Sequence, residues 1–119
     1  MTQKTLTLGQ KQRNFTKMVG DLIIYVYSHN GWSLTLGDAY RDSRLHGEVG
    51  IKKGYGASKS LHKSRLAIDF NLFVNGEYIT DGDHPAYKDI TDYWKAIGGT
   101  SGIDWNDGNH FSLEHQGRK

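Results

Sequence analysis

The hydrophobic pattern is most regular in the first quarter of the chain. Apolar side chains there recur at intervals of three and four residues, which predicts an amphipathic helix over roughly residues 8–29. Thr7 and Gln10 have the spacing of a capping box at its start, and Asn30-Gly31 supplies a left-handed stop. A small domain needs this apolar stripe as core, so we do not assign it to a partner. The stripe consists of Phe15, Met18, Val19, Leu22, Ile23 and Val26.

Two later stretches alternate between apolar and polar positions, as half-buried strands do. The first is Trp32 to Leu36, and the second begins at Leu66. Asn75-Gly76 then predicts a two-residue hairpin turn, and a last short strand is expected around residues 109–113. In the second stretch the alternation places Leu66, Ile68, Phe70 and Leu72 on one face and Ala67, Asp69 and Asn71 on the other.

A second helix is predicted after the acidic turn that ends at Pro85, with Gly98-Gly99 as its stop. Residues 42–60 are rich in glycine and charge without periodicity, which predicts a long loop of the kind that is often functional. The order of elements predicts an α+β fold with an antiparallel sheet packed by helices. The apolar face of the second helix would carry Tyr87, Ile90, Trp94 and Ile97.

Length and composition limit the number of domains and the kinds of site that the chain can have. A chain of 119 residues is too short for two ordinary domains, so we predict one domain over residues 1–119. The net charge of +2 suits anionic partners, including cell-wall polymers or nucleic acid, without selecting one. The absence of cysteine excludes disulfides and thiolate metal sites. No apolar run is long enough for a signal peptide or a membrane span, so we expect a soluble cytosolic chain.

Residues that could bind a metal or take part in catalysis lie beside the predicted strands. If the strand with Asp69 neighbours the last strand, then His62, Asp69 and His110 converge on one face. Two imidazoles and a carboxylate form a ligand set of the catalytic zinc type. Asp107, three residues before His110, is then the candidate general base. Arg41 could polarise a substrate carbonyl or bind a carboxylate.

Structural interpretations of the same residues stay open. His62 and His110 could be ordinary loop or turn residues, Asp69 could bond backbone at a strand edge, and Arg41 could pair with a nearby aspartate. A metal-dependent nuclease using His110 with Asn71 or Asn109 is one alternative, although the basic residues form no dense stripe. A binding module without activity is another. We favour structural roles for His29, His46, His84 and His115.

Two short segments together resemble a known family. "SLHKSRLAID" resembles the S-x-H-x-x-G-x-A-x-D signature of the D-alanyl-D-alanine and L-alanyl-D-glutamate peptidases, the M15 family, and "DGNHF" resembles its D-x-x-H-F signature. "AYR", residues 39–41, resembles the segment that carries a substrate-binding arginine. The family glycine of the first signature is Arg65 here, and the tryptophan-glycine segment before the second is only partly present, as "GGTSGIDW".

The resemblance implies both a fold and an activity. The fold would be that of hedgehog and the D-Ala-D-Ala peptidases. By similarity, His62, Asp69 and His110 would bind zinc (Zn), Asp107 would be the base, and Arg41 would stabilise the scissile carbonyl, with Ser60 also binding substrate.

The short chain is most similar to the phage endolysins of the family. These cleave the L-alanyl-D-glutamate bond of bacterial peptidoglycan, with D-Ala-D-Ala carboxypeptidase activity as the alternative. Such a protein would be made in the host cytoplasm, reach the periplasm and wall through holin lesions, and act as a monomer without nucleic acid or membrane insertion.

Overall fold

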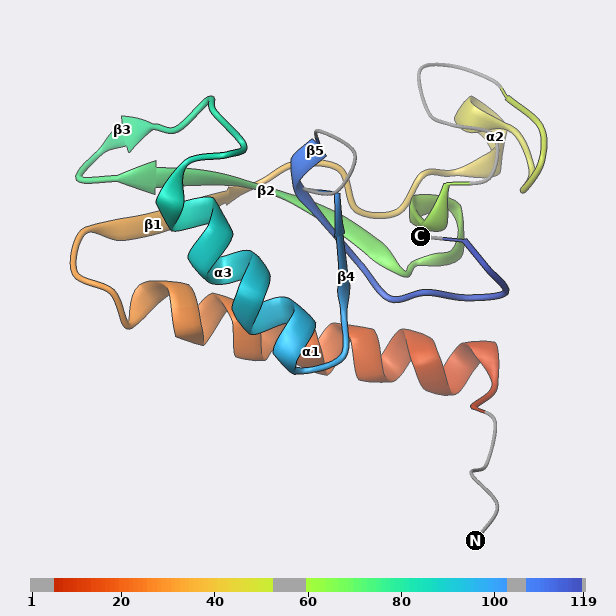
Figure 1. Cartoon of the computed structure of the whole chain (residues 1–119). Coiled ribbons are helices and arrows are strands. Elements are labelled where there is room, and N and C mark those ends of the chain that lie inside the picture. Colours follow the sequence, from red (N-terminus) through yellow and green to blue (C-terminus); the bar gives the residue numbers. More distant parts are fainter. Residues whose placement is uncertain (1–5, 53–59, 103–106, 119) are drawn as a thin grey trace, which may run out of the picture.

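The fold is a five-stranded antiparallel sheet with two long helices packed on it (Figure 1). The computed structural model describes residues 6–52, 60–102 and 107–118. No helix within these ranges is long and apolar enough to cross a bilayer. The α+β architecture expected from the sequence is confirmed. The elements are α1 (Leu8–Tyr27), β1 (Trp32–Leu36), α2 (Ser43–His46), the 3-10 helix η1 (Leu61–Ser64), β2 (Ala67–Val74), β3 (Glu77–Tyr78), α3 (Pro85–Ala96), β4 (Thr100–Gly102) and β5 (Asp107–Ser112).

Helix α1 begins as its sequence predicts. The Thr7 hydroxyl accepts from the Gln10 backbone N–H at 3.2 Å, and the Gln10 side chain accepts from the Thr7 backbone N–H at 2.9 Å. This capping box satisfies two N–H groups that the helix itself cannot pair. The helix ends two residues before the expected boundary, at Tyr27, and Gly31 follows with a φ of 82°.

The core lies between the sheet and the pair α1 and α3. Phe15 of α1 meets Trp94 of α3 edge to face at 5.7 Å between ring centroids, and Trp94 meets Phe111 of β5 at 5.9 Å. On β2 the apolar face is buried as predicted, whereas Asp69 on the opposite face is partly exposed. The aspartate therefore lies in a strand that is anchored by its other side. The buried residues of that anchor are Leu66, Ile68, Phe70 and Leu72.

Strand β2 organises the sheet, whose order is β1-β2-β5-β4, with β3 also pairing with β2. Asn75 and Gly76 both have positive φ, 52° and 81°, and turn the chain from β2 into β3 as the Asn-Gly signal predicts. Strands β3 and β5 share one edge of β2: β3 pairs with Phe73 and Val74, and β5 pairs with residues 67–69.

Two short elements differ from the sequence prediction. The segment predicted as an irregular loop contains α2, which forms because the Asp42 carboxylate accepts from the Arg44 backbone N–H at 2.8 Å. Residues 53–59 of that loop lie outside the described residues. Strand β4 was not predicted, because its three residues show no apolar alternation. It is held instead by Trp94, whose indole N–H donates to the carbonyls of Thr100 and Ser112 at 2.9 and 3.0 Å.

Candidate metal centre and active site

The register of β2 and β5 brings two candidate ligands together. Asp69 and His110 are directly opposite each other in this antiparallel pair, so their side chains lie on the same face. His110 Nδ1 is 3.4 Å from Asp69 Oδ1, and the His110 side chain is only 8% exposed. The strand with Asp69 and the last strand are therefore neighbours, as the convergence of Asp69 and His110 requires.

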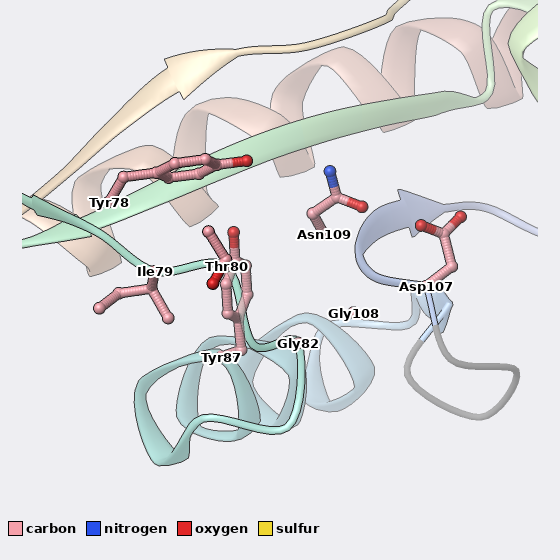
Figure 2. Close-up of a pocket in the computed structure, with 8 residues that line it drawn as sticks. All are labelled: Tyr78, Ile79, Thr80, Gly82, Tyr87, Asp107, Gly108 and Asn109. Carbon is pink, nitrogen blue, oxygen red and sulfur yellow. The ribbon is translucent and has the colours of Figure 1, made fainter.

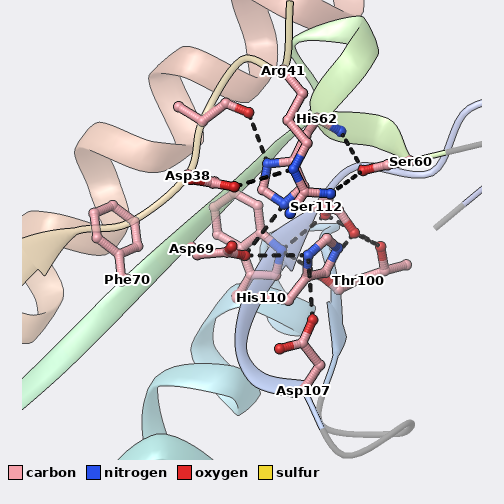
Figure 3. Close-up of polar contacts among 12 residues, drawn as sticks. Asp38, Arg41, Ser60, His62, Asp69, Phe70, Thr100, Asp107, His110 and Ser112 are labelled. Carbon is pink, nitrogen blue, oxygen red and sulfur yellow. Dashed lines mark hydrogen bonds and ion pairs between the residues drawn. The ribbon is translucent and has the colours of Figure 1, made fainter. Parts of the chain in front are cut away.

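The third residue arrives from η1 rather than from a strand entrance. Ser60 caps η1 by accepting the His62 backbone N–H at 3.2 Å. Arg65 ends η1 in the left-handed conformation, with φ 56° and ψ 35°, and so reverses the chain into β2. This reversal brings His62 Nε2 to 3.3 Å from Asp69 Oδ1 (Figure 3). Metal ligands in proteins come mainly from His, Cys, Asp and Glu. Among the described residues, one group of three of these has ligand atoms that all lie within 4.8 Å of one another: His62, Asp69 and His110.

Hydrogen bonding fixes which nitrogen of His62 faces this centre. Nδ1 lies 2.7 Å from the carbonyl oxygen of Ala39, which can only accept, so Nδ1 carries the proton. In the neutral imidazole Nε2 then has a lone pair, and it faces a carboxylate oxygen. Both His62 Nε2 and Asp69 Oδ1 are buried and make no hydrogen bond with any described residue. A positive charge between these two atoms satisfies both of them, and either a proton on Nε2 or a metal ion can supply it.

The charge of Asp69 suits the same role. Burial raises the pKa of this carboxyl, but the neighbouring imidazoles, His110 first and then His62, outweigh burial and bring the pKa to about 2. Asp69 is therefore a carboxylate across the neutral pH range, as a metal ligand must be. The donor set of two nitrogens and one oxygen fits zinc, and three protein ligands leave a position open.

Asp107 lies at the edge of this centre. Its Oδ2 is 3.9 Å from His110 Nδ1, and its side chain is 49% exposed. The carboxylate thus adjoins the three ligands and still reaches solvent, which is the placement that a group exchanging protons with substrate needs.

Arg41 lies on the opposite side of the three ligands from Asp107 (Figure 3). Its Nε donates to Asp38 at 3.2 Å and its Nη1 donates to the Ser60 hydroxyl at 3.1 Å. Its backbone N–H donates to the His62 carbonyl at 2.9 Å. The pairing with Asp38 that the sequence left open is present, and it holds the guanidinium beside the centre.

Sequence reasoning missed three supports of the site. The Ala39 carbonyl orients His62, and no side-chain pattern marks such a group. Gly37 lies against Asp69, where a Cβ would be 3.0 Å from the aspartate Cβ. Gly102 of β4 lies against both Asp107 and His110, and only its place in the "TSGIDW" segment hinted at a role.

A comparison with family models adds an independent finding. The M15 peptidase model described as D-alanyl-D-alanine carboxypeptidase matches residues 53–113, just over half of the chain. The chain belongs to the M15 peptidase family. No curated protein matches the chain. The matched range contains Ser60, all three candidate ligands and Asp107, and Arg41 lies outside it. M15 members are zinc peptidases that act on peptidoglycan, so the family supports a peptidoglycan-related metallopeptidase.

Arg65 occupies the position of the M15 signature glycine. Its backbone has a positive φ, which glycine adopts more readily than any other residue. A non-glycine residue with φ of 56° carries a strain of about 1 kcal/mol. The Arg65 guanidinium lies 4.1 Å from the centroid of the Tyr40 ring, and a cation–π contact at an exposed site offsets about 0.5 kcal/mol. The turn in this chain therefore has a left-handed residue at the position of the signature glycine without having glycine there.

Two substitutions of Arg65 distinguish the effect of its backbone conformation on stability from the effect of its side chain. Arg65→Gly and Arg65→Ala both lose the Tyr40 contact, but only glycine relieves the left-handed strain. We expect Arg65→Gly to be about 1 kcal/mol more stable than Arg65→Ala in urea unfolding. Equal stability of the two variants would contradict the left-handed assignment.

Gly102→Ala is expected to damage the centre directly. The added Cβ would lie 2.1 Å from the Asp107 carbonyl oxygen and 2.8 Å from the His110 Cβ, so β4 and β5 must separate. We expect a loss of about 2 kcal/mol in the free energy of unfolding and reduced zinc content. Gly20→Ala is the control, because a Cβ there meets nothing within 4 Å in the middle of α1. It should gain about 0.5 kcal/mol from helix propensity.

Two of the other described histidines, His29 and His84, have structural contacts. His29 Nδ1 lies 2.9 Å from the Tyr25 carbonyl at the end of α1, and its ring stacks on Trp32 at 3.9 Å. His84 is the N-cap of α3 and accepts the Ala86 backbone N–H at 3.0 Å. These contacts account for both rings without a catalytic function.

Proposed function

We propose that this chain is a zinc-dependent endopeptidase of the cell-wall stem peptide, that it cleaves the L-alanyl-D-glutamate bond, and that it serves host lysis as a phage endolysin. The observation that carries the metal is the pair of buried lone pairs, on His62 Nε2 and Asp69 Oδ1, facing each other at 3.3 Å. The class of substrate follows from the family.

In this proposal His62, Asp69 and His110 hold the metal. When bound, zinc supplies Lewis-acid chemistry, polarising a carbonyl and activating water at neutral pH. The Ala39 carbonyl accepts from His62 Nδ1 and so aims Nε2 at the centre. The antiparallel register keeps Asp69 and His110 opposite each other, so two of the three ligands come from rigid strands.

Asp107 moves the proton. Its carboxylate takes a proton from the attacking water and delivers it to the nitrogen of the departing amine, which leaves as a neutral amine. Its position beside His110 and its exposure to solvent support this assignment. The water oxygen first bonds to the carbonyl carbon, and the C–N bond of the peptide breaks afterwards, as the amine nitrogen receives the proton.

Arg41 stabilises negative charge that develops on the substrate oxygen. A guanidinium held by Asp38 and Ser60 is fixed before substrate arrives, so little reorganisation is needed. Ser60 thereby orients Arg41 as well as capping η1, and its hydroxyl lies where it can also contact substrate.

Digestion of purified peptidoglycan tests the substrate assignment. Mass spectrometry of the released fragments should show new amino-terminal D-glutamate or its amidated form. Release of free D-alanine alone would instead identify the carboxypeptidase reaction. For the lysis role, we expect cells that express this chain to lyse rapidly only when a holin is co-expressed. Equal lysis without the holin would contradict the proposed route to the wall.

A further inference from the structure

A pocket lies in a gap along one edge of β2. Strand β3 occupies this edge at Phe73 and Val74, and β5 occupies it at residues 67–69. Between them no described strand pairs with β2, and the Ile79 N–H alone extends from β3 to the Leu72 carbonyl, at 2.9 Å. The Tyr87 hydroxyl fills the gap, accepting the Leu72 N–H at 2.9 Å and donating to the Phe70 carbonyl at 3.2 Å. Above Tyr87 remains a cavity of about 180 Å³, which has room for part of one residue of a ligand.

The walls of the pocket bring neutral polar groups together (Figure 2). Tyr78 of β3 and Thr80 of the connection that follows supply hydroxyls, and Asn109 supplies an amide from β5. The two walls approach closely because Gly82 and Gly108 meet: a Cβ on Gly108 would lie 2.6 Å from the Gly82 carbonyl oxygen. This contact fixes the width of the pocket.

The charge around the pocket has one sign. Asp107 lines it, and no lysine, arginine or histidine is among the described residues that do. The nearby turn adds Asp81 and Asp83, both exposed. Arg41, in contrast, lies across the three ligands from Asp107 (Figure 3). A carboxylate in the pocket would approach Asp107 with no cationic side chain among the described lining residues to offset the repulsion, whereas a carboxamide can donate to Asp107 and accept from a hydroxyl.

The pocket and the reaction share Asp107. If Asp107 gives its proton to the departing amine, as the proposed function states, then the residue that carries this amine lies beside Asp107 and next to the pocket. We infer that this pocket is the leaving-group subsite and that it selects an uncharged polar residue over one with a free carboxylate. For the L-alanyl-D-glutamate bond this means the form whose α-carboxyl is amidated. The inference rests on the proposed function for its direction along the substrate.

Two synthetic stem-peptide fragments test this selectivity. They are identical except that the residue after the scissile bond carries an α-carboxamide or an α-carboxylate. We expect the zinc-loaded protein to cleave the carboxamide with a kcat/KM at least about tenfold higher. Thr80→Lys places a cation in the wall and should reverse the preference. Thr80→Val removes the hydroxyl without adding charge, and should weaken the preference without reversing it. Thr80 is exposed, so both variants should retain fold and zinc.

The possible outcomes test the subsite and the proposed function separately. Equal or faster cleavage of the carboxylate peptide by the unmodified protein overturns the subsite and leaves the peptidase intact. If neither peptide is cleaved, the proposed function fails, and binding decides the subsite. Calorimetric titration with the two amine-side product peptides should then show tighter binding of the carboxamide, and the reverse in Thr80→Lys. Equal affinities, or binding of neither peptide, would overturn the subsite on its own.

Discussion

Asp107→Asn is expected to keep its zinc and to release stem-peptide fragments from peptidoglycan about 100- to 10,000-fold more slowly. The amide has nearly the shape of the carboxylate but cannot take the proton of the attacking water. Because Asp107 Oδ2 is 3.9 Å from His110 and is not one of the three clustered ligands, its loss should leave the metal in place. Initial rates on purified peptidoglycan and zinc content by mass spectrometry measure the two effects.

The control for this variant is Asp83→Asn. It makes the same change of charge on the neighbouring acidic turn, in an exposed side chain outside the three-residue cluster. Its rate should stay within about twofold of the unmodified protein, as expected for a screened surface charge. Comparable losses in both variants would assign the effect to overall charge, and undiminished lysis by Asp107→Asn would remove Asp107 as the base.

Asp69→Asn is expected to abolish zinc binding and all activity, because the amide lacks the negative charge of the carboxylate, which is the one anionic group among the three ligands. In the unmodified protein, zinc at about 1,000 times its Kd should raise the free energy of unfolding by about 4 kcal/mol. The variant should show no such increment.

Urea unfolding with zinc and with a chelator measures this difference. Asn71→Ala is the matched control, because residue 71 lies on the same face of β2, two positions farther along the strand. Its zinc-dependent increment should remain. A variant Asp69→Asn that zinc still stabilises by several kcal/mol would show that the ion binds elsewhere.

The elements that the sequence predicted are those with strong local signals. The capping box at Thr7, the alternation through Asp69 and the Asn75-Gly76 turn each specify backbone geometry by residue type, and all three appear in the structure. Strand β4 escaped prediction because the side chain of Trp94 holds it, and helix α2 because it is a single turn held by a local cap at Asp42.

The sequence predicted the residues of the candidate site, but not the contacts that position them. Signature residues identified His62, Asp69 and His110, whereas their convergence depended on a pairing of β2 with β5 that no local pattern specifies. The left-handed Arg65 could not be foreseen, because arginine rarely adopts that conformation. The pocket beside Asp107 exists only because two strands leave a gap on one edge, which is a property of the assembled sheet.

Direct titration of the metal-free protein with zinc tests the central claim, that His62, Asp69 and His110 form one metal site. Calorimetry of the unmodified chain should give one tightly bound ion per molecule, and His62→Ala should lose that binding while the Asp107→Asn site still fills. Undetectable binding by the unmodified chain, or an unchanged isotherm for His62→Ala, would contradict the claim.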